Sequence, residues 1–242
     1  MHASAHLVAD RPPGRARTRC TTLRSSPPLT LRATGHDLVH LVGSAAGPVG
    51  GDDLHLSVSV GAGGRMTLRS VAASLVLPGP HGAPSSLAVD VDLGSGASLR
   101  WLPEPTILVR GCDHRAITTV RLAVGARLVW REVVVLGRHA ETTGSLLQRL
   151  RVDVEDRPLL RNDLAVGPAW PASQGSAGTG DAGVVATALV VDPRAATLRL
   201  DVTAGVRGAV MPLAGPAAVV SLVADRPGAA MAALDTVLDG IG

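Results

Sequence analysis

The sequence predicts a mainly β fold: stacked β-hairpins that form a two-layer, β-helix-like superhelix with one or two α-helices. The first observation is a module of strand, Gly-rich turn and strand over residues 47–66. The second is that the same plan returns at residues 88–99 and 120–128. The third is composition: with 46% hydrophobic but only 1% aromatic residues, Val, Leu and Ala must build the core, and their β-branched share favours strands.

The turn glycines set the period of the repeat. Gly63, Gly96 and Gly125 lie 33 and 29 residues apart, and Trp101 and Trp130 follow their turns at the same offset. A strand-borne period of roughly 30 residues indicates stacked hairpins whose apolar faces share one continuous core. Because the period is inexact, a plain β-sandwich is the alternative arrangement.

The N-terminal part of the chain is basic, and residues 1–24 carry five arginines. One interpretation is a basic arm for an acidic partner or nucleic acid; the other is a terminus followed by an edge strand that its arginines keep soluble. We expect residues 1–14 to be flexible. The alternation of apolar and polar residues then predicts strands at residues 29–32, 38–42, 54–60, 65–77 and 86–93.

The second half continues the same pattern. Residues 129–138 are apolar on both faces, which predicts a central strand, and residues 145–164 predict two strands around a tight turn at 155–158. Residues 167–183 are rich in Gly, Ser and Ala and predict a mobile loop within a single domain of residues 1–242. Further strands are expected at residues 184–191, 197–202 and 217–223. Apolar residues spaced by three or four predict one helix at residues 227–241.

Residue types exclude several functions. The chain contains no Lys, so its net charge of +3 comes from Arg. A phosphate-binding P-loop and Schiff-base chemistry both need a Lys, so any work on a nucleotide requires a partner protein. With three Trp and no Phe or Tyr, the chain cannot form an aromatic platform for single-stranded nucleic acid.

Two sequence features bear on the compartment. The chain has two cysteines, Cys20 and Cys112, and no apolar segment of a secretion signal follows Met1, so we expect a reducing, cytoplasmic setting. The uncharged run at residues 208–224 is broken by two prolines, whereas a membrane span needs about 20 apolar residues. We therefore expect no membrane association.

Two carboxylates stand out on stiff loops. Asp52 follows a Gly pair at a strand entrance, where it could contribute to a divalent-cation site or a polar pore lip, or only cap a turn. Glu104 lies between two prolines, which fix its backbone and forbid a helix. Its carboxylate is suited to a contact site, and simple solvent exposure is the alternative.

Three further side chains carry possible metal chemistry. Cys112 and His114 flank Asp113, and all three residue types bind nickel or zinc, although an ordinary loop is the favoured interpretation of so short a cluster. Glu132 lies in the predicted central strand, where a buried carboxylate must be paired or protonated. It either forms an internal ion pair with an Arg or lines an internal polar passage.

Five stretches, taken together and in this order, resemble the UreD/UreH urease accessory proteins over roughly residues 15–240. They are Gly50-Gly51-Asp52 entering an alternating strand, the G-A-x-L turns, residues 102–107, residues 130–138, and Gln148-Arg149-Leu150 followed by Arg157-Pro158-Leu159.

The resemblance implies a non-enzymatic, cytoplasmic maturation scaffold. Such proteins bind apo-urease and a UreF-like partner that recruits the UreG-type GTPase, and nickel is thought to move through a passage in the UreD-like subunit. The resemblance makes Asp52, Glu104 and Glu132 candidates for lining this passage for transient Ni²⁺, and Arg138 a candidate for partner binding or a core ion pair. No tightly bound cofactor is expected.

The chain departs from the family pattern at residues 72–77, where a polar stretch with Lys is usual, at its N-terminal segment, and at its C-terminal end. These departures bear on partner affinity more than on the fold. The alternative function is a β-solenoid enzyme that acts on polysaccharide with paired carboxylates. The chain has only four Glu and no aromatic surface to stack sugars, which disfavours that alternative.

Overall fold

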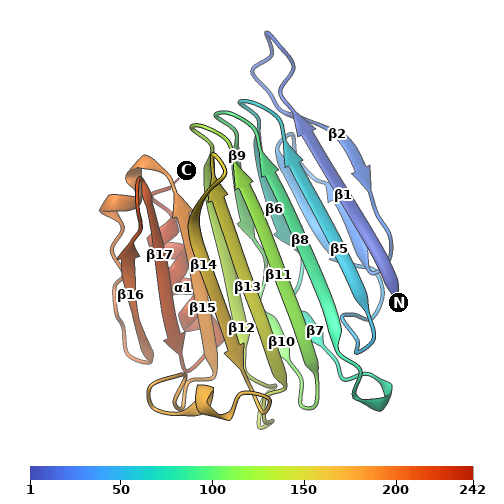
Figure 1. Ribbon diagram of the computed structural model, residues 1–242, viewed down its shortest axis with the longest axis vertical. Coiled ribbons are helices and arrows are strands. Elements are labelled where there is room, and N and C mark those ends of the chain that lie inside the picture. The colour runs from blue at the N-terminus through green and yellow to red at the C-terminus, as the bar shows by residue number, and fades with distance from the viewer. Residues whose placement is uncertain (242) are drawn as a thin grey trace.

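The computed structural model describes residues 1–241 and consists of three layers (Figure 1): two facing β-sheets and one helix. Sheet A contains, in spatial order, β14 (Arg157–Val166), β13 (Ser145–Val154), β11 (Asp113–Leu122), β8 (Ser85–Leu93), β5 (Asp53–Val60), β1 (His2–Asp10) and β2 (Arg19–Arg24). Sheet B contains β16 (Val206–Pro212), β17 (Ala217–Ala224), β15 (Val184–Val191), β12 (Arg127–Val135), β9 (Ser98–Leu102), β6 (Arg65–Ser70), β4 (Leu38–Gly43) and β3 (Leu29–Ala33). Two short strands, β7 (Ser74–Val76) and β10 (Thr106–Leu108), pair with each other, and β10 joins β12. The helices are α1 (Pro227–Leu238) and three 3₁₀ turns, η1 (Pro80–Gly82), η2 (Pro171–Gln174) and η3 (Pro193–Thr197).

The predicted mainly β, solenoid-like stack is confirmed, and the structure shows how each repeat contributes to it. In each unit the first strand joins sheet A and the second joins sheet B, so β5 and β6, β8 and β9, and β11 and β12 face each other across the core. Equivalent strands of successive units pair in parallel. The two strands of a unit therefore bond to neighbouring units instead of to each other.

The glycine turns that define the repeat stack on one another. Gly63, Gly96 and Gly125 have φ values of 64°, 64° and 67°, in the left-handed region that glycine adopts without a steric penalty. The amide of Gly63 donates to the carbonyl of Ser95, and the amide of Gly96 donates to the carbonyl of Val124. These bonds hold successive turns in register at one end of the stack.

The main core lies between the sheets and follows from alternation along the strands. In β5, Leu54, Leu56, Val58 and Val60 are each at most 1% exposed, while the residues between them face away from the core. Trp101 and Trp130 are the large side chains at the centre of this core. Since the aliphatic residues are small and branched, the core forms from many strands instead of a few aromatic anchors.

A second core lies between sheet B and α1. Ala230, Leu234, Val237 and Leu238 of the helix are buried against the outer face of β12, β15 and β17. Pro227 begins the helix, where its missing N–H costs no hydrogen bond. The predicted C-terminal helix at 227–241 is confirmed, with its last regular residue at 238.

Three expectations need correction. Residues 2–10, expected to be flexible, form β1, which pairs in parallel with β5 and buries Ala3, Ala5, Leu7 and Ala9. Residues 65–77 form two strands, β6 and β7, separated by residues 71–73. Residues 198–202 form no strand; η3 precedes them, and the next strand is β16. The loop at 167–183 contains η2.

Candidate internal passage

A cavity of about 100 Å³ lies between the two sheets and gathers several of the predicted side chains. Its polar lining comes from both sheets and from the loop between β9 and β10: Ser70, Ser74, Glu104, Thr106, His114, Thr118, Glu132 and Gln148. Its apolar lining includes Trp101 and Trp130. Burying a polar group inside a β-stack costs free energy unless the group is hydrogen-bonded. The many polar side chains at this cavity therefore distinguish it from the apolar rest of the core.

Glu132 is the central acid of this cavity. It projects from β12 toward sheet A, lines the cavity and is half-buried. Burial of the carboxyl raises the pKa of Glu132 to about 7, although contacts with Trp130 and Gln148 oppose this rise. The neighbouring Arg131 points to the other side of sheet B, so no internal ion pair joins these two residues.

His114 faces the same cavity from β11 of sheet A and is 2% exposed. Burial lowers the pKa of His114 to about 4, so the imidazole is neutral at physiological pH. Its Nδ1 lies 2.8 Å from the Ser85 hydroxyl. In the tautomer with the proton on Nδ1, this nitrogen donates to the Ser85 hydroxyl, and Nε2 carries a free lone pair. A neutral imidazole nitrogen with a free lone pair is the form that binds metals.

Glu104 lies where sheet B is interrupted. β6 and β9 end at Ser70 and Leu102, and their continuations β7 and β10 resume only after short irregular segments. The amide of Glu104 donates to the Ser70 hydroxyl at 2.9 Å, and the amide of Ser74 donates to the Pro105 carbonyl at 2.9 Å. The two irregular segments thus interrupt sheet B at the wall of the cavity and are hydrogen-bonded to each other. The half-buried Glu104 lies in this interruption.

Trp101 and Trp130 form one apolar wall of the cavity. Trp130 is 1% exposed, and within residues 1–241 its Nε1–H has no hydrogen-bond partner of normal geometry, although the indole lies close enough to Glu132 to lower that residue's pKa. A buried donor without a partner is unusual in native proteins. Here it is next to the carboxylate and the cavity, where a polar occupant could satisfy it.

Asp52 lies away from this cavity, at the entrance of β5. It is 6% exposed, its Oδ2 accepts from the amide of Val49 at 2.9 Å, and its Oδ1 lies 2.9 Å from the amino group of Met1. These contacts fit the turn-capping interpretation of this residue.

Cys112 also lies outside the residues that line the cavity. It is 3% exposed in an apolar cluster with Val76, Leu108 and Leu146. Burial, together with the nearby Asp113 carboxylate, raises the pKa of Cys112 to about 11. The group is therefore a thiol at neutral pH, whereas a metal ligand must be a thiolate.

Arg138 lies on the surface, in the loop after β12. Its guanidinium forms a two-pronged contact with Glu141, with Nε–Oε2 and Nη2–Oε1 distances of 2.8 and 2.9 Å. This pairing lowers the pKa of Glu141 to about 2. The guanidinium is exposed, which leaves it accessible to a partner.

The structure thus places Glu104, Glu132 and His114 at one cavity, and Asp52, Cys112 and Arg138 at three other places. Sequence reasoning missed Gln148, Ser85 and the indole of Trp130 as neighbours of these groups. The inward position of Gln148 among the apolar residues of β13 was the available signal. Within residues 1–241, no three His, Cys, Asp or Glu side chains are arranged to hold a metal ion, and no helix is long and apolar enough to cross a membrane.

Comparisons with known proteins match the chain over its whole length. Residues 1–241 match the family model described as UreD urease accessory protein. The chain is similar to a protein named urease accessory protein UreD from Parafrankia sp. (strain EAN1pec), 40% identical over 88% of this chain and 80% of that protein. It is also similar to the proteins of that name from Frankia alni, 40% identical over 93% and 88% of the two chains, and from Streptomyces avermitilis, 36% identical over 100% and 98%.

Proposed function

This chain belongs to the UreD urease accessory protein family, and from that premise we propose that it is a maturation scaffold through which nickel reaches apo-urease. In this proposal the protein carries out no catalysis of its own. It works in the cytoplasm, binds apo-urease and a UreF-like accessory protein, and takes part in the complex that the UreG-type GTPase joins through UreF. GTP hydrolysis belongs to that partner, because this chain has no Lys for a phosphate-binding loop.

One observation supports the passage more than any other: Glu104, Glu132 and His114, from both sheets and a sheet break, line the same cavity. Carboxylate oxygen and neutral imidazole nitrogen are both ligands for nickel. An approaching cation favours the ionised form of Glu132, whose pKa near 7 means that little free energy is needed to release its proton. We propose that transient Ni²⁺ meets these groups one after another between the sheets.

The roles of the remaining candidates follow from their places in the fold. Arg138 is exposed, so we propose that it contributes to partner binding. Contact of Asp52 and Cys112 with nickel stays a proposal. The capping hydrogen bond of Asp52 favours a structural role for that residue, and the raised pKa of the Cys112 thiol favours a structural role for Cys112. The alternative of a polysaccharide-acting enzyme gains no support from the relatives to which the chain is similar.

The experiment is nickel loading of apo-urease in a reconstituted accessory complex. Glu104→Gln, Glu132→Gln and the double variant remove the carboxylates at nearly constant shape, and Glu155→Gln, in the exposed turn between β13 and β14, is the matched control. Bound ⁶³Ni per urease active site is measured, and complex formation is measured separately by co-purification. We expect loading to fall several-fold in the double variant while the complex still forms. Full loading by the double variant would overturn the passage.

A further inference from the structure

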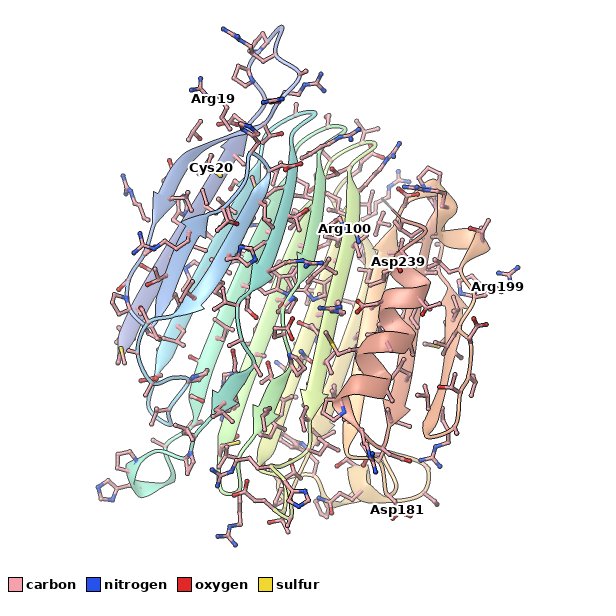
Figure 2. The ribbon with its side chains drawn as sticks, turned by 180° about the vertical axis from the view of Figure 1, so that it is seen from behind. Arg19, Cys20, Arg100, Asp181, Arg199 and Asp239 are labelled. Atoms are coloured by element: carbon pink, nitrogen blue, oxygen red, sulfur yellow. The ribbon has the colours of Figure 1, made fainter. Side chains whose placement is uncertain are left out.

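The outer face of sheet B is covered over only part of its width. Helix α1 packs on β12, β15, β16 and β17, whereas no helix of residues 1–241 lies over β3, β4, β6 and β7. Figure 2 shows this side, with α1 to the right and the bare strands to its left. We call this uncovered area the open face, made by Arg32, His40, Arg69, Val71, Leu75 and Ile107.

One row of the open face is cationic. Strand register places Arg32 beside His40 and His40 beside Arg69, on three neighbouring strands. Arg32 and Arg69 are exposed, and neither guanidinium has a hydrogen bond or ion pair among residues 1–241. On sheet A, three outward arginines, Arg121, Arg149 and Arg161, each pair with an aspartate, whereas the exposed Arg24 and Arg115 have no such partner among residues 1–241.

The arginines of sheet B also repel one another. Burial lowers the pKa of Arg100 and Arg131, and Arg69 lowers both further, while Asp235 and Glu104 raise the pKa of Arg131 and Asp239 raises that of Arg100. Repulsion among like charges destabilises the isolated protein and is relieved when an acidic surface binds. The exposed Arg32 and Arg69 therefore favour the binding of a negatively charged surface to the open face.

A second row of the open face is apolar. Leu75 of β7 pairs in register with Ile107 of β10, which pairs with Val135 of β12. Leu75 is 42% exposed, and Val71, in the segment between β6 and β7, is 56% exposed. These side chains surround the sheet break that holds Glu104. A cationic row beside an apolar row is complementary to a partner helix that has acidic side chains on one side and apolar side chains on the adjacent side.

Helix α1 is an example of a helix that packs on the outer face of sheet B. Its apolar side packs on sheet B while Asp235 accepts a hydrogen bond from Arg131 at 2.5 Å. At its C-terminal end Asp239 lies near Arg100 (Figure 2), and Arg100 donates to the carbonyl of Ile241. A largely apolar helix with one carboxylate, Asp235, thus already packs on one part of this sheet face through apolar contacts and a carboxylate–arginine pair.

We propose that the open face is the docking site for an acidic amphipathic helix of a partner protein, packed beside α1. This inference rests on the proposed function, because the partner is a member of the urease maturation complex. A nucleic acid fits less well, because Leu75, Ile107 and Val71 interrupt the cationic surface and no aromatic side chain is exposed there. The bound helix would lie over the break beside Glu104.

The test uses charge reversal in the full chain, co-expressed with apo-urease and its accessory proteins. Arg32→Glu with Arg69→Glu is compared with Arg24→Glu with Arg115→Glu, two exposed arginines of sheet A with the same charge change. We expect the first pair to weaken complex formation at least tenfold, about 1.4 kcal/mol, and the control pair to leave it unchanged. Thermal unfolding confirms that both double variants are folded, as expected for exposed sites.

Photo-crosslinking identifies the occupant. A benzophenone amino acid replaces Leu75 or, as control, Ile117 on sheet A, because the two side chains are 42% and 43% exposed. We expect position 75 to crosslink to a helical segment rich in Asp and Glu, and position 117 not to do so. Crosslinking of position 75 to a second copy of this chain, to nucleic acid or to a segment without acidic residues would overturn the inference. If the wild-type complex forms and charge reversal has no effect, only the docking site fails; if no wild-type complex forms, the proposed function fails with it.

Discussion

Trp130 stacks on Trp101 with ring centroids 4.9 Å apart and an interplanar angle of 12°. The two residues are in register on the parallel strands β12 and β9, so the stack is a direct product of the repeat. Both rings also line the cavity that contains Glu132. The repeat therefore builds the core and one wall of the candidate passage with the same pair of side chains.

Replacement of Trp130 by Ala should destabilise the protein by about 3–5 kcal/mol, because the ring is fully buried and a cavity would remain. Trp130→Phe keeps an aromatic ring and removes the unpartnered N–H, so it should cost much less. Urea unfolding followed by circular dichroism measures both. Trp170→Ala, in the half-exposed loop before η2, is the control and should change stability by less than about 1 kcal/mol. Equal losses for Trp130→Ala and Trp170→Ala would contradict this account of the core.

Removal of the Asp235 carboxylate should loosen α1 from sheet B. Arg131 is 4% exposed and keeps only the Pro103 carbonyl when Asp235 is lost, while Asp235 itself is 56% exposed. Because one partner is solvated, we expect Asp235→Ala to cost about 1–2 kcal/mol, less than a fully buried pair. Hydrogen exchange of residues 227–238 measures the loosening. Thr236→Ala, at an exposed neighbouring position, is the control. Unchanged protection of the helix in Asp235→Ala would refute the role of the Arg131–Asp235 pair in holding α1 on sheet B.

Cys112 should resist alkylation in the native protein. Burial, with a smaller effect of Asp113, raises its pKa to about 11, so on the order of one thiol in a thousand is ionised at pH 8. Iodoacetamide followed by mass spectrometry should modify the half-buried Cys20 first, and both cysteines at similar rates after unfolding in urea. Rapid native modification of Cys112 would indicate an accessible thiolate and restore it as a nickel ligand candidate.

The sequence was sufficient for the features that depend on local pattern. Alternation in residues 54–60 identified the buried face, and the spacing of Gly63, Gly96 and Gly125 identified the stacked turns. It was not sufficient for β1, whose inward residues are mostly alanines and whose partner β5 lies some 50 residues further along the chain. A small side chain gives a weak apolar signal, and a parallel pairing over such a separation leaves no local trace.

The same limit applied to the candidate site. Glu132 was identifiable as a buried carboxylate because its strand is apolar on both faces. Its neighbours were not, since Gln148 reaches it from the other sheet and His114 is held by Ser85, a residue 29 positions earlier. The interruption of sheet B at Glu104 could not be predicted from the sequence, because it depends on residues 71–73 and 103–105 lying side by side.

The stability of the protein should depend on the ionisation of Glu132. Burial raises its pKa from 4.5 in the unfolded chain to about 7 in the folded protein, so between these values the folded state holds the proton more tightly. The free energy of unfolding is therefore highest below pH 4.5 as far as this group is concerned, falls as the pH rises from 4.5 to 7, and stays at the lower value above pH 7. The full effect is roughly 3–4 kcal/mol at most, because each pKa unit corresponds to about 1.4 kcal/mol.

Glu132→Gln removes the titrating group, so the difference in unfolding free energy between this variant and wild type should grow in favour of the variant as the pH rises from 5 to 8. Urea denaturation at several pH values measures this difference, and the subtraction cancels the titration of all groups that the two proteins share. Glu155→Gln, at an exposed turn, should give a difference that does not change with pH over the same range. A constant difference for Glu132→Gln would mean that water reaches the carboxylate freely, and Glu132 would then contact solvent instead of a desolvated interior cavity.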